Sequence, residues 1–485
     1  MITLPGSYSN IDTYAEDLSR FIDSPLFRQI TGDIHVNDAL IYNAWEALPA
    51  EWTAWWSSIP DHRLVQQDLV DSIEELSTIS PTKNETNNNN ENRRALNPSD
   101  RPESLTTWLR TMQSLSLPRS QRPGPTIDLP PVLTGRMKTK KIAEVSTAAA
   151  YIHHVCETKN ITHIIDMGSG QGYLCVSLAY LFPHLRILAI DGSETQLAAS
   201  RAAAASLGVP EQRIQHLRRF IEGGGGRSSS SSSSASAASS LTEEMAAWAA
   251  GEKCMLVGLH ACGNLSEHML RFFVEAPFIT CLGTVGCCYN HIVPRSAACP
   301  DGFPISEKMR GQGVQLSATA LMTGCQAPNN WERADLSGEK ESSSDYSKRR
   351  LYRAVLEKIL FDKGIEVGGT ADKRPVWGVR KGDMDSLASF TRRAVSCLGI
   401  DGVRITDEEL AAYEDRYRGH SGRIAILWTL SVMCCKIVES VIALDRYLFL
   451  TENGGEEVEV LPIFDYRISP RNLMLIACKN NKSNR

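Results

Sequence analysis

The sequence predicts an α/β fold built around a mostly parallel β-sheet. Three observations carry this prediction. An apolar strand over Ile164–Met167 ends at a glycine-rich turn, a second apolar strand over Arg186–Asp191 ends in a carboxylate, and Tyr173–Leu181 between them has the composition of a buried helix. A strand, a crossover helix and a parallel strand in this order form a β-α-β unit.

The glycine-rich turn has the sequence Asp166-Met167-Gly168-Ser169-Gly170-Gln171-Gly172. A dinucleotide-binding fingerprint would need its third glycine at position 173, which is Tyr173. The observed spacing instead suits S-adenosylmethionine, which has no pyrophosphate for the turn to hold. We expect the three glycines to leave room for the amino-acid and sulfonium end of this cofactor, and Asp166 to attract its ammonium group. A turn that only packs a helix onto a strand is the alternative.

A second acid, Asp191, ends the strand Arg186–Asp191. A carboxylate at this position can accept hydrogen bonds from both ribose hydroxyls of a nucleoside. Ligands gather at the carboxyl ends of the strands in an open parallel sheet, so Asp191 is expected beside the glycine-rich turn. A helix N-cap or turn residue is the alternative interpretation.

Two later apolar runs predict strands that end at the same edge of the sheet. Cys254–Leu259 is the expected fourth strand and Thr280–Gly286 the fifth. Residues that follow the fourth strand, His260 and Asn264, are the candidate catalytic residues. The titration range of His260 suits removal of a proton from an attacking nitrogen. A packed, hydrogen-bonded histidine is the alternative.

The same edge raises the question of a zinc site, because thiolates and imidazoles are the usual zinc ligands. The side chains concerned are His260, Cys262, Cys287, Cys288, His291 and Cys325. No Cys-x-x-Cys pair is present. Adjacent strand residues such as Cys287 and Cys288 point to opposite faces, so we predict no metal and ordinary buried cysteines.

Composition excludes several other classes of protein. The formal net charge of −5 gives no overall basic field, and no DNA-reading motif is present, so a nucleic-acid partner would need a local patch such as Arg136, Lys138, Lys140 and Lys141. Thirteen cysteines without regular spacing argue against a secreted disulfide framework. The N-terminus lacks a signal-peptide pattern, and the longest apolar stretch, Ile424–Cys435, is too short to span a bilayer. We expect a soluble intracellular protein, cytoplasmic or nuclear, with no membrane partner.

Low-complexity segments predict the domain organisation. We expect an N-terminal helical region over residues 1–79, a disordered linker over 80–104 and a catalytic domain over 105–485. Within that domain, 223–240 is an expected flexible insertion and about 307–445 an expected helical insert. The last strands are expected at Tyr447–Leu450, Val458–Ile463 and Leu473–Cys478.

Several strings in this sequence resemble the methyltransferase-like protein 25 family. The first four are Met137–Lys141, Asp166–Gly172, Gly258–Leu265 and Gly286–Tyr289. Further matches are Phe303–Ser306, Gly324–Pro328, Leu444–Arg446 and Ser469–Leu473, so the resemblance covers most of the chain outside the linkers. It implies a Rossmann-like class I methyltransferase sheet, mostly parallel with an antiparallel last strand, and S-adenosylmethionine as the methyl donor.

These observations predict a methyltransferase that acts on a macromolecular acceptor, protein or RNA, because the large helical additions exceed what a metabolite site needs. Enzymes that methylate adenine amines typically place Asn or Asp, a proline-containing pair and an aromatic residue after the fourth strand. This chain has His-Ala-Cys-Gly-Asn there. A non-catalytic scaffold that binds the cofactor would explain the difference. A nicotinamide-dependent oxidoreductase is the weaker alternative, and the oligomeric state stays open.

Overall fold

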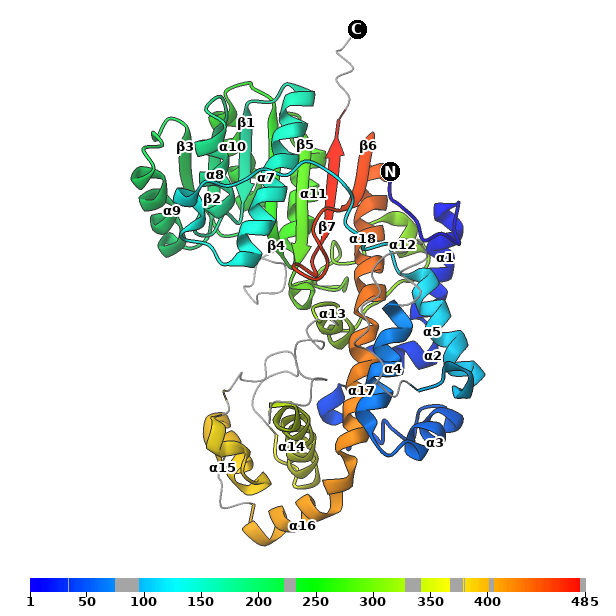
Figure 1. The fold of residues 1–485 in the computed structure, drawn as a ribbon. Coiled ribbons are helices and arrows are strands. Elements are labelled where there is room, and N and C mark those ends of the chain that lie inside the picture. Colours follow the sequence, from blue (N-terminus) through cyan, green and yellow to red (C-terminus); the bar gives the residue numbers. More distant parts are fainter. Residues whose placement is uncertain are drawn as a thin grey trace, which may run out of the picture. The chain divides into compact units, whose positions relative to one another are not determined.

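The chain divides into two compact units in a computed structural model (Figure 1). The structure describes residues 1–33, 35–74, 96–221, 233–327, 342–366, 378, 380–400 and 405–479. We call the first unit the sheet domain; it comprises Met1–Ser19, Leu117–Gln315 and Glu439–Arg485. We call the second unit the helical domain; it comprises Arg20–Ser116 and Leu316–Val438.

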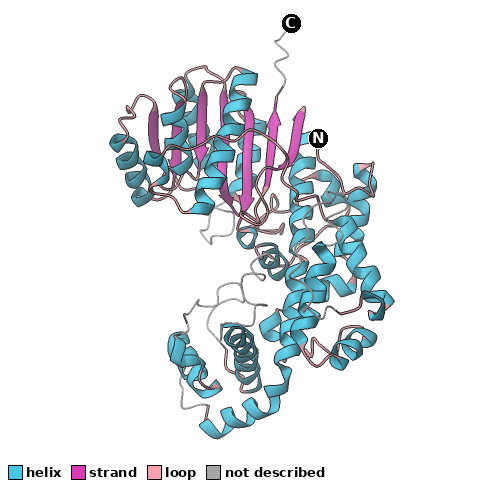
Figure 2. Ribbon diagram, in the orientation of Figure 1, coloured by secondary structure: helices cyan, strands magenta, loops and turns pink. Residues whose placement is uncertain are grey.

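The sheet domain contains a seven-stranded sheet in the order β3-β2-β1-β4-β5-β7-β6. Its strands are magenta in Figure 2. The strands are β1 (His163–Met167), β2 (Arg186–Asp191), β3 (Ile214–Arg218), β4 (Cys254–Cys262), β5 (Ile279–Cys287), β6 (Glu457–Pro462) and β7 (Leu473–Cys478). The first five pair in parallel, whereas β7 is antiparallel to both of its neighbours. The predicted mostly parallel sheet with an antiparallel last strand is confirmed. Since β1 lies between β2 and β4, the chain order reverses there, and such a switch point is where open α/β sheets bind ligands.

Helices pack on the sheet because its central strands are apolar on both faces. Every residue of β1 is buried, as is every residue of β4 from Cys254 to Gly258. The helices of this domain include α6 (Pro131–Thr134), α7 (Thr139–Lys159), α8 (Tyr173–Leu181), α9 (Glu194–Ser206), α10 (Ser233–Ala249), α11 (Leu265–Glu275) and α12 (Glu307–Gly311). Residues of α7, α8 and α9 share one core with alternate residues of the strands. Near-continuous apolar strands are the pattern expected of a parallel sheet covered on both faces.

The helical domain packs around a group of tryptophans. Its helices include α2 (Pro25–Arg28), α3 (Ala50–Ser58), α4 (His62–Glu74), α5 (Glu103–Leu115), α13 (Ala318–Gly324), α14 (Ser342–Asp362), α15 (Leu387–Leu398), α16 (Asp407–Tyr417) and α17 (Ser421–Met433). The ring of Trp52 lies 5.8 Å from that of Trp56 and 5.6 Å from that of Trp108. Two helices, α1 (Ile11–Ile22) and α18 (Cys435–Glu452), contribute residues to both domains.

The structure corrects the predicted domain boundaries. Residues 105–116 and the insert residues 316–438 belong with the N-terminal helices rather than with the sheet. Of the expected linker, 80–95 lies outside the described residues, whereas Pro98–Asp100 forms a 3-10 turn and α5 begins at Glu103. Arg101 holds this segment in place, because its guanidinium lies 2.6 Å from the buried carboxylate of Asp68.

Two further element predictions were wrong. Residues Tyr447–Leu450 form the last turns of α18 instead of a strand, and the helical spacing of the buried Leu444 and Leu448 explains why. Residues 233–240 of the expected flexible insertion 223–240 are helical, because α10 begins at Ser233, and residues 223–232 lie outside the described residues. Leu241 and Met245, one turn apart and both buried, anchor α10.

The helical run around the predicted apolar stretch is longer than expected. Residues Asp407–Glu452 are long and apolar enough to cross a membrane by length and composition alone. However, 83% of the apolar window is buried inside the protein, as it would be in a core helix of a globular fold.

Breaking the buried Arg101–Asp68 pair should destabilise the helical domain. Arg101→Ala leaves a buried carboxylate without its cation, and we expect a loss of roughly 3–5 kcal/mol in the free energy of unfolding. Urea unfolding followed by tryptophan fluorescence measures this loss. The control is Arg110→Ala, because Arg110 is exposed on α5. Equal unfolding midpoints for the two variants would contradict this account.

Candidate functional site

The glycine-rich turn joins β1 to α8 in a backbone conformation that favours glycine. Gly168, Gly170 and Gly172 have φ angles of 74°, 55° and 78°, in the left-handed region that side chains disfavour. A Cβ on Gly168 would also sit 2.9 Å from Cδ2 of Leu265, at the start of α11. The turn therefore lies beside the end of β4, as the sequence predicted. Its three glycines leave the space that side chains would fill.

Asp166 is buried at the carboxyl end of β1 and is only partly satisfied. The residue is 2% exposed, and among the described residues its Oδ2 has no hydrogen-bond partner. Burial raises the pKa of this carboxyl to about 7; hydrogen bonds from Cys175 oppose the rise and the charge of Asp191 adds to it. Ser169 Oγ in the same turn is also buried without a partner among the described residues. A buried acceptor of this kind fits a cationic donor such as the ammonium group of an amino acid.

Asp191 holds the turn against β2. Its Oδ2 accepts the N–H of Gly170 at 2.9 Å, and its Oδ1 accepts the N–H of Ser193 at 2.8 Å. Each carboxylate oxygen can accept a further hydrogen bond, and the residue is half-buried. Asp191 is therefore placed as predicted, at the strand end beside the turn, with acceptor capacity left for hydroxyl groups.

Sequence reasoning missed Phe220, which follows β3 at the same edge. This side chain is 77% exposed. A Cβ on Gly192, the residue after Asp191, would sit 2.7 Å from Cδ2 of Phe220, so the ring lies over this glycine. The available signal was an isolated aromatic residue between β3 and a glycine-serine tract. An exposed ring beside a carboxylate with free acceptor capacity is suited to stacking on a base.

His260 lies inside β4, not after it, because this strand runs to Cys262. Its Nε2 lies 2.6 Å from Lys141 Nζ and 3.1 Å from Glu144 Oε2. Lys141 Nζ is also 2.7 Å from the same Glu144 oxygen, so the three side chains form a triangle. The ring is about one third exposed, with a side-chain exposure of 35%, so a molecule in solvent can reach it.

Glu144 was not predicted, although it organises this triangle. Burial raises the pKa of its carboxyl, but the hydrogen bonds and charges of His260 and Lys141 outweigh that effect and lower the pKa to about 2. Ser469 Oγ donates to its other oxygen at 2.8 Å. The signal in the sequence was an acid on the apolar face of α7, one position before Val145.

Asn264, the second predicted catalytic residue, has a structural contact. It is 7% exposed, and its Oδ1 accepts the N–H of Val293 at 2.8 Å. This hydrogen bond ties the start of α11 to the segment after β5. This contact indicates that Asn264 supports the site. Among the described residues, no contact of Asn264 favours its predicted catalytic role.

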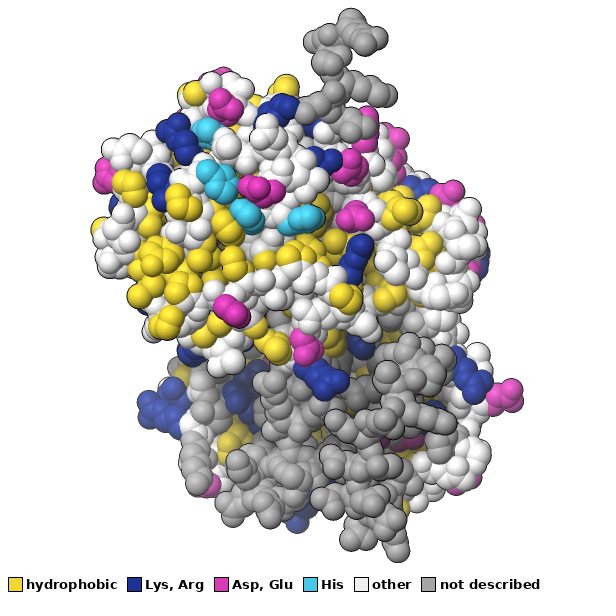
Figure 3. Space-filling model, turned by 45° about the horizontal axis from the view of Figure 1, so that its top comes forward, with side chains coloured by type: hydrophobic (Ala, Val, Ile, Leu, Met, Phe, Trp, Pro, Cys, Tyr) yellow, Lys and Arg dark blue, Asp and Glu magenta, His cyan; other side chains and the backbone are white. Residues whose placement is uncertain are grey.

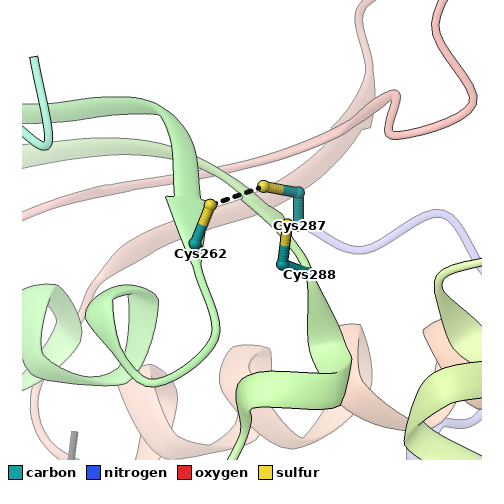
Figure 4. Close-up of side chains that lie close together, drawn as sticks. All are labelled: Cys262, Cys287 and Cys288. Carbon is teal, nitrogen blue, oxygen red and sulfur yellow. Dashed lines mark hydrogen bonds between the residues drawn. The ribbon is translucent and has the colours of Figure 1, made fainter. Parts of the chain in front are cut away.

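The cysteines at the ends of β4 and β5 do not follow the alternation of side-chain directions that the sequence analysis assumed for a strand. The sulfur atoms of Cys262, Cys287 and Cys288 lie within 4.8 Å of one another (Figure 4). Because β5 ends at Cys287 and Cys288 has a φ of 50°, the chain turns there and both sulfurs face Cys262. The argument that Cys287 and Cys288 point to opposite faces was therefore wrong.

The residues of this site lie in a part of the chain that resembles known methyltransferases. Residues 140–295, which include the turn, Asp191 and the Glu144–His260 pair, match the family model described as "Methyltransferase domain". This chain is similar to proteins named methyltransferase-like protein 25. It is 27% identical over 237 residues to "Probable methyltransferase-like protein 25" of Mus musculus and 28% identical over 240 residues to the protein of that name from Homo sapiens. The resemblance inferred from the sequence strings is confirmed.

These matches are partial. They cover 47% and 48% of this chain and 38% of each relative, so the chain spans well under half the length of these relatives. Among solved structures, the plantazolicin methyltransferase BpumL in complex with SAH has a TM-score of 0.21 and 15% identity, covering 39% of this chain and 58% of that one. The strand order, rather than this likeness, defines the fold.

The raised pKa of Asp166 predicts how stability depends on pH in the ligand-free protein. The folded pKa of about 7 exceeds the usual 3.8, so its stabilising contribution is complete below about pH 4 and is lost as the pH rises to 7. Asp166→Asn removes this loss and should raise the melting temperature relative to wild type at pH 8 but not at pH 4. Thermal unfolding at several pH values tests this. The control is Asp128→Asn, because Asp128 is exposed; parallel wild-type and Asp166→Asn curves would contradict the assignment.

Proposed function

We propose that this chain is an S-adenosylmethionine-dependent methyltransferase. The observation that carries the proposal is the buried oxygen of Asp166, left without a partner among the described residues at the tip of β1 and beside a turn of left-handed glycines. The family match over residues 140–295 supports the same activity. When bound, this cofactor supplies a methyl group that its sulfonium already activates.

Each part of the proposed cofactor has a candidate partner. Asp166 would hold the ammonium group, and Gly168–Gly172 would leave space for the amino-acid portion. Asp191 would accept the ribose hydroxyls. Phe220 would stack on the adenine, a contact that needs only an exposed ring beside the ribose-binding acid.

His260 is the candidate general base that removes a proton from the substrate to be methylated. Nε2 could take a proton from a nitrogen or oxygen once the ammonium of Lys141, which lies 2.6 Å from it, turns wholly to Glu144, which it already contacts. Glu144, 3.1 Å from Nε2, would then balance the charge of the imidazolium. Glu144 and Lys141 act through His260 and are positioning residues.

We propose a macromolecular acceptor, RNA or protein, in the cytoplasm or nucleus. Exposed cationic side chains support an anionic acceptor. They are Arg136, Lys138 and Lys140, which come directly before Lys141 in the sequence. The guanidinium of Arg136 lies 5.6 Å from the ring centre of Tyr173, at the start of α8. A local patch can bind phosphate or carboxylate groups even though the whole chain is acidic.

A methyl-transfer assay tests the proposed activity. Transfer of a labelled methyl group from S-adenosylmethionine to cellular RNA or protein fractions should occur with wild type. His260→Gln should lower kcat by roughly 10²–10⁴-fold, with little change in cofactor KM, because general-base catalysis contributes about this much. His154→Gln is the control, since His154 is exposed on α7. Cofactor binding without transfer to any fraction would favour the non-catalytic scaffold.

Replacement of Phe220 tests the proposed adenine contact separately. Phe220→Ala should weaken binding of S-adenosylmethionine by roughly 1–3 kcal/mol, the range measured for base stacking on an aromatic side chain. Phe220→Trp should retain binding. Equilibrium dialysis with labelled cofactor measures both. The control is Phe361→Ala, because Phe361 is 58% exposed in the helical domain; unchanged binding in Phe220→Ala would remove this residue from the pocket.

A further inference from the structure

Two groups of potential metal ligands occur among the described residues. One consists of Cys262, Cys287 and Cys288, and the other of His153, Glu157 and His184. In each group the ligand atoms lie within 4.8 Å of one another. Figure 3 shows histidine side chains close to acidic ones on one face of the molecule.

The imidazoles of the second group already have a partner. His184 Nε2 lies 3.3 Å and His153 Nε2 3.6 Å from the same oxygen of Glu157. The ring of His153 is stacked on Phe182, with ring centres 3.7 Å apart. Glu157 and His184 are exposed. Surface contacts of one acid with two imidazoles, one of them stacked on a ring, explain this group without a metal.

The three cysteines come together for a different reason. Cys262 and Cys287 are register partners on the parallel strands β4 and β5, and their sulfurs lie 3.3 Å apart. Cys288 joins them only because its backbone takes the left-handed conformation, which is uncommon for a residue other than glycine. Such backbone strain persists where the surrounding structure enforces it, and it often marks a functional site.

The loops after the two strands are packed closely enough to fix this arrangement. Gly263, directly after Cys262, has a φ of 52°, and a Cβ there would sit 2.5 Å from Cβ of His291. Gly263 also donates its N–H to the carbonyl of Cys287 at 3.0 Å. Cys262 and Cys287 are thus held by both a strand pairing and a loop contact, which preorganises their sulfurs.

Three sulfurs at this spacing match the geometry of a thiolate-bound zinc ion. Zinc–sulfur bonds of about 2.3 Å in a tetrahedral site place neighbouring sulfurs about 3.8 Å apart. The observed separations, 3.3 Å for Cys262–Cys287 and no more than 4.8 Å for the others, bracket that value. Soft thiolate ligands select zinc over magnesium or calcium.

We propose that Cys262, Cys287 and Cys288 bind one zinc ion, with its fourth coordination position open. Cys287 is buried, Cys288 is half-buried and Cys262 is exposed, so the site opens to solvent on the Cys262 side. Three protein ligands with one open position is the arrangement of zinc sites that bind an exogenous ligand. This proposal does not rest on the proposed methyl transfer, although β4 carries both Cys262 and His260.

Metal analysis of the full-length protein tests this proposal. Protein purified without chelators should contain about one zinc ion per chain, and Cys262→Ser, Cys287→Ser and Cys288→Ser should each lose it. Cys299→Ser and His184→Ala should retain it, because Cys299 lies outside the cysteine group and His184 belongs to the other group. Cobalt substitution should give thiolate-to-cobalt absorption that Cys288→Ser abolishes.

Differential alkylation covers the case in which a variant fails to fold. In wild type, iodoacetamide should modify Cys262 and Cys288 slowly in the presence of zinc and rapidly after treatment with EDTA, while Cys299 should react at the same rate in both. Zinc-free wild type that does not take up added zinc would overturn the proposal. A disulfide between Cys262 and Cys287 in protein kept under mild reductant would also overturn it, as would metal lost only from His184→Ala.

Discussion

A buried carboxylate must be compensated by cations or hydrogen bonds, and this constraint shapes the sheet domain. Glu439 is fully buried and is paired with Arg119 at 2.7 Å and Arg471 at 3.2 Å, while Tyr289 donates to it at 2.7 Å. Asp445 accepts the N–H groups of Ile305 and Ser306 and the Ser306 hydroxyl. Asp166 and Glu267 depart from this pattern, since each has a buried oxygen without a partner among the described residues. Asp166 is the one that lies beside the turn of left-handed glycines, so we assign its oxygen to a ligand.

The same constraint accounts for residues in three of the family strings that lie far from the glycine-rich turn in the sequence. Tyr289, Asp445, Ser469 and Arg471 all come from such strings, and each contacts a buried acid or is one. Ser469 donates to Glu144, so a string near the C-terminus reaches the triangle that holds His260. These three strings therefore include residues that stabilise buried charge. They do not by themselves identify an acceptor.

The sequence was sufficient where a local pattern determines the structure. It gave the bounds of β2, α8 and β7 and the placement of Asp166 and Asp191, because apolar strands and glycine turns are local signals. Glu144, Phe220 and the cysteine group depend on which strands become neighbours. No local pattern places Glu144 beside His260, which is 116 residues away along the chain. The reversal of the chain at Cys288 is a departure from strand geometry that alternation cannot anticipate.

The central claim is that Asp166 anchors the ammonium group of the cofactor. Calorimetric titration of wild type and Asp166→Asn with S-adenosylhomocysteine and with methylthioadenosine, which lacks the amino-acid portion, tests it most directly. We predict that wild type binds S-adenosylhomocysteine much more tightly than methylthioadenosine and that Asp166→Asn removes most of this difference. Equal affinities of wild type for the two ligands, or no binding of either by folded protein, would contradict the account.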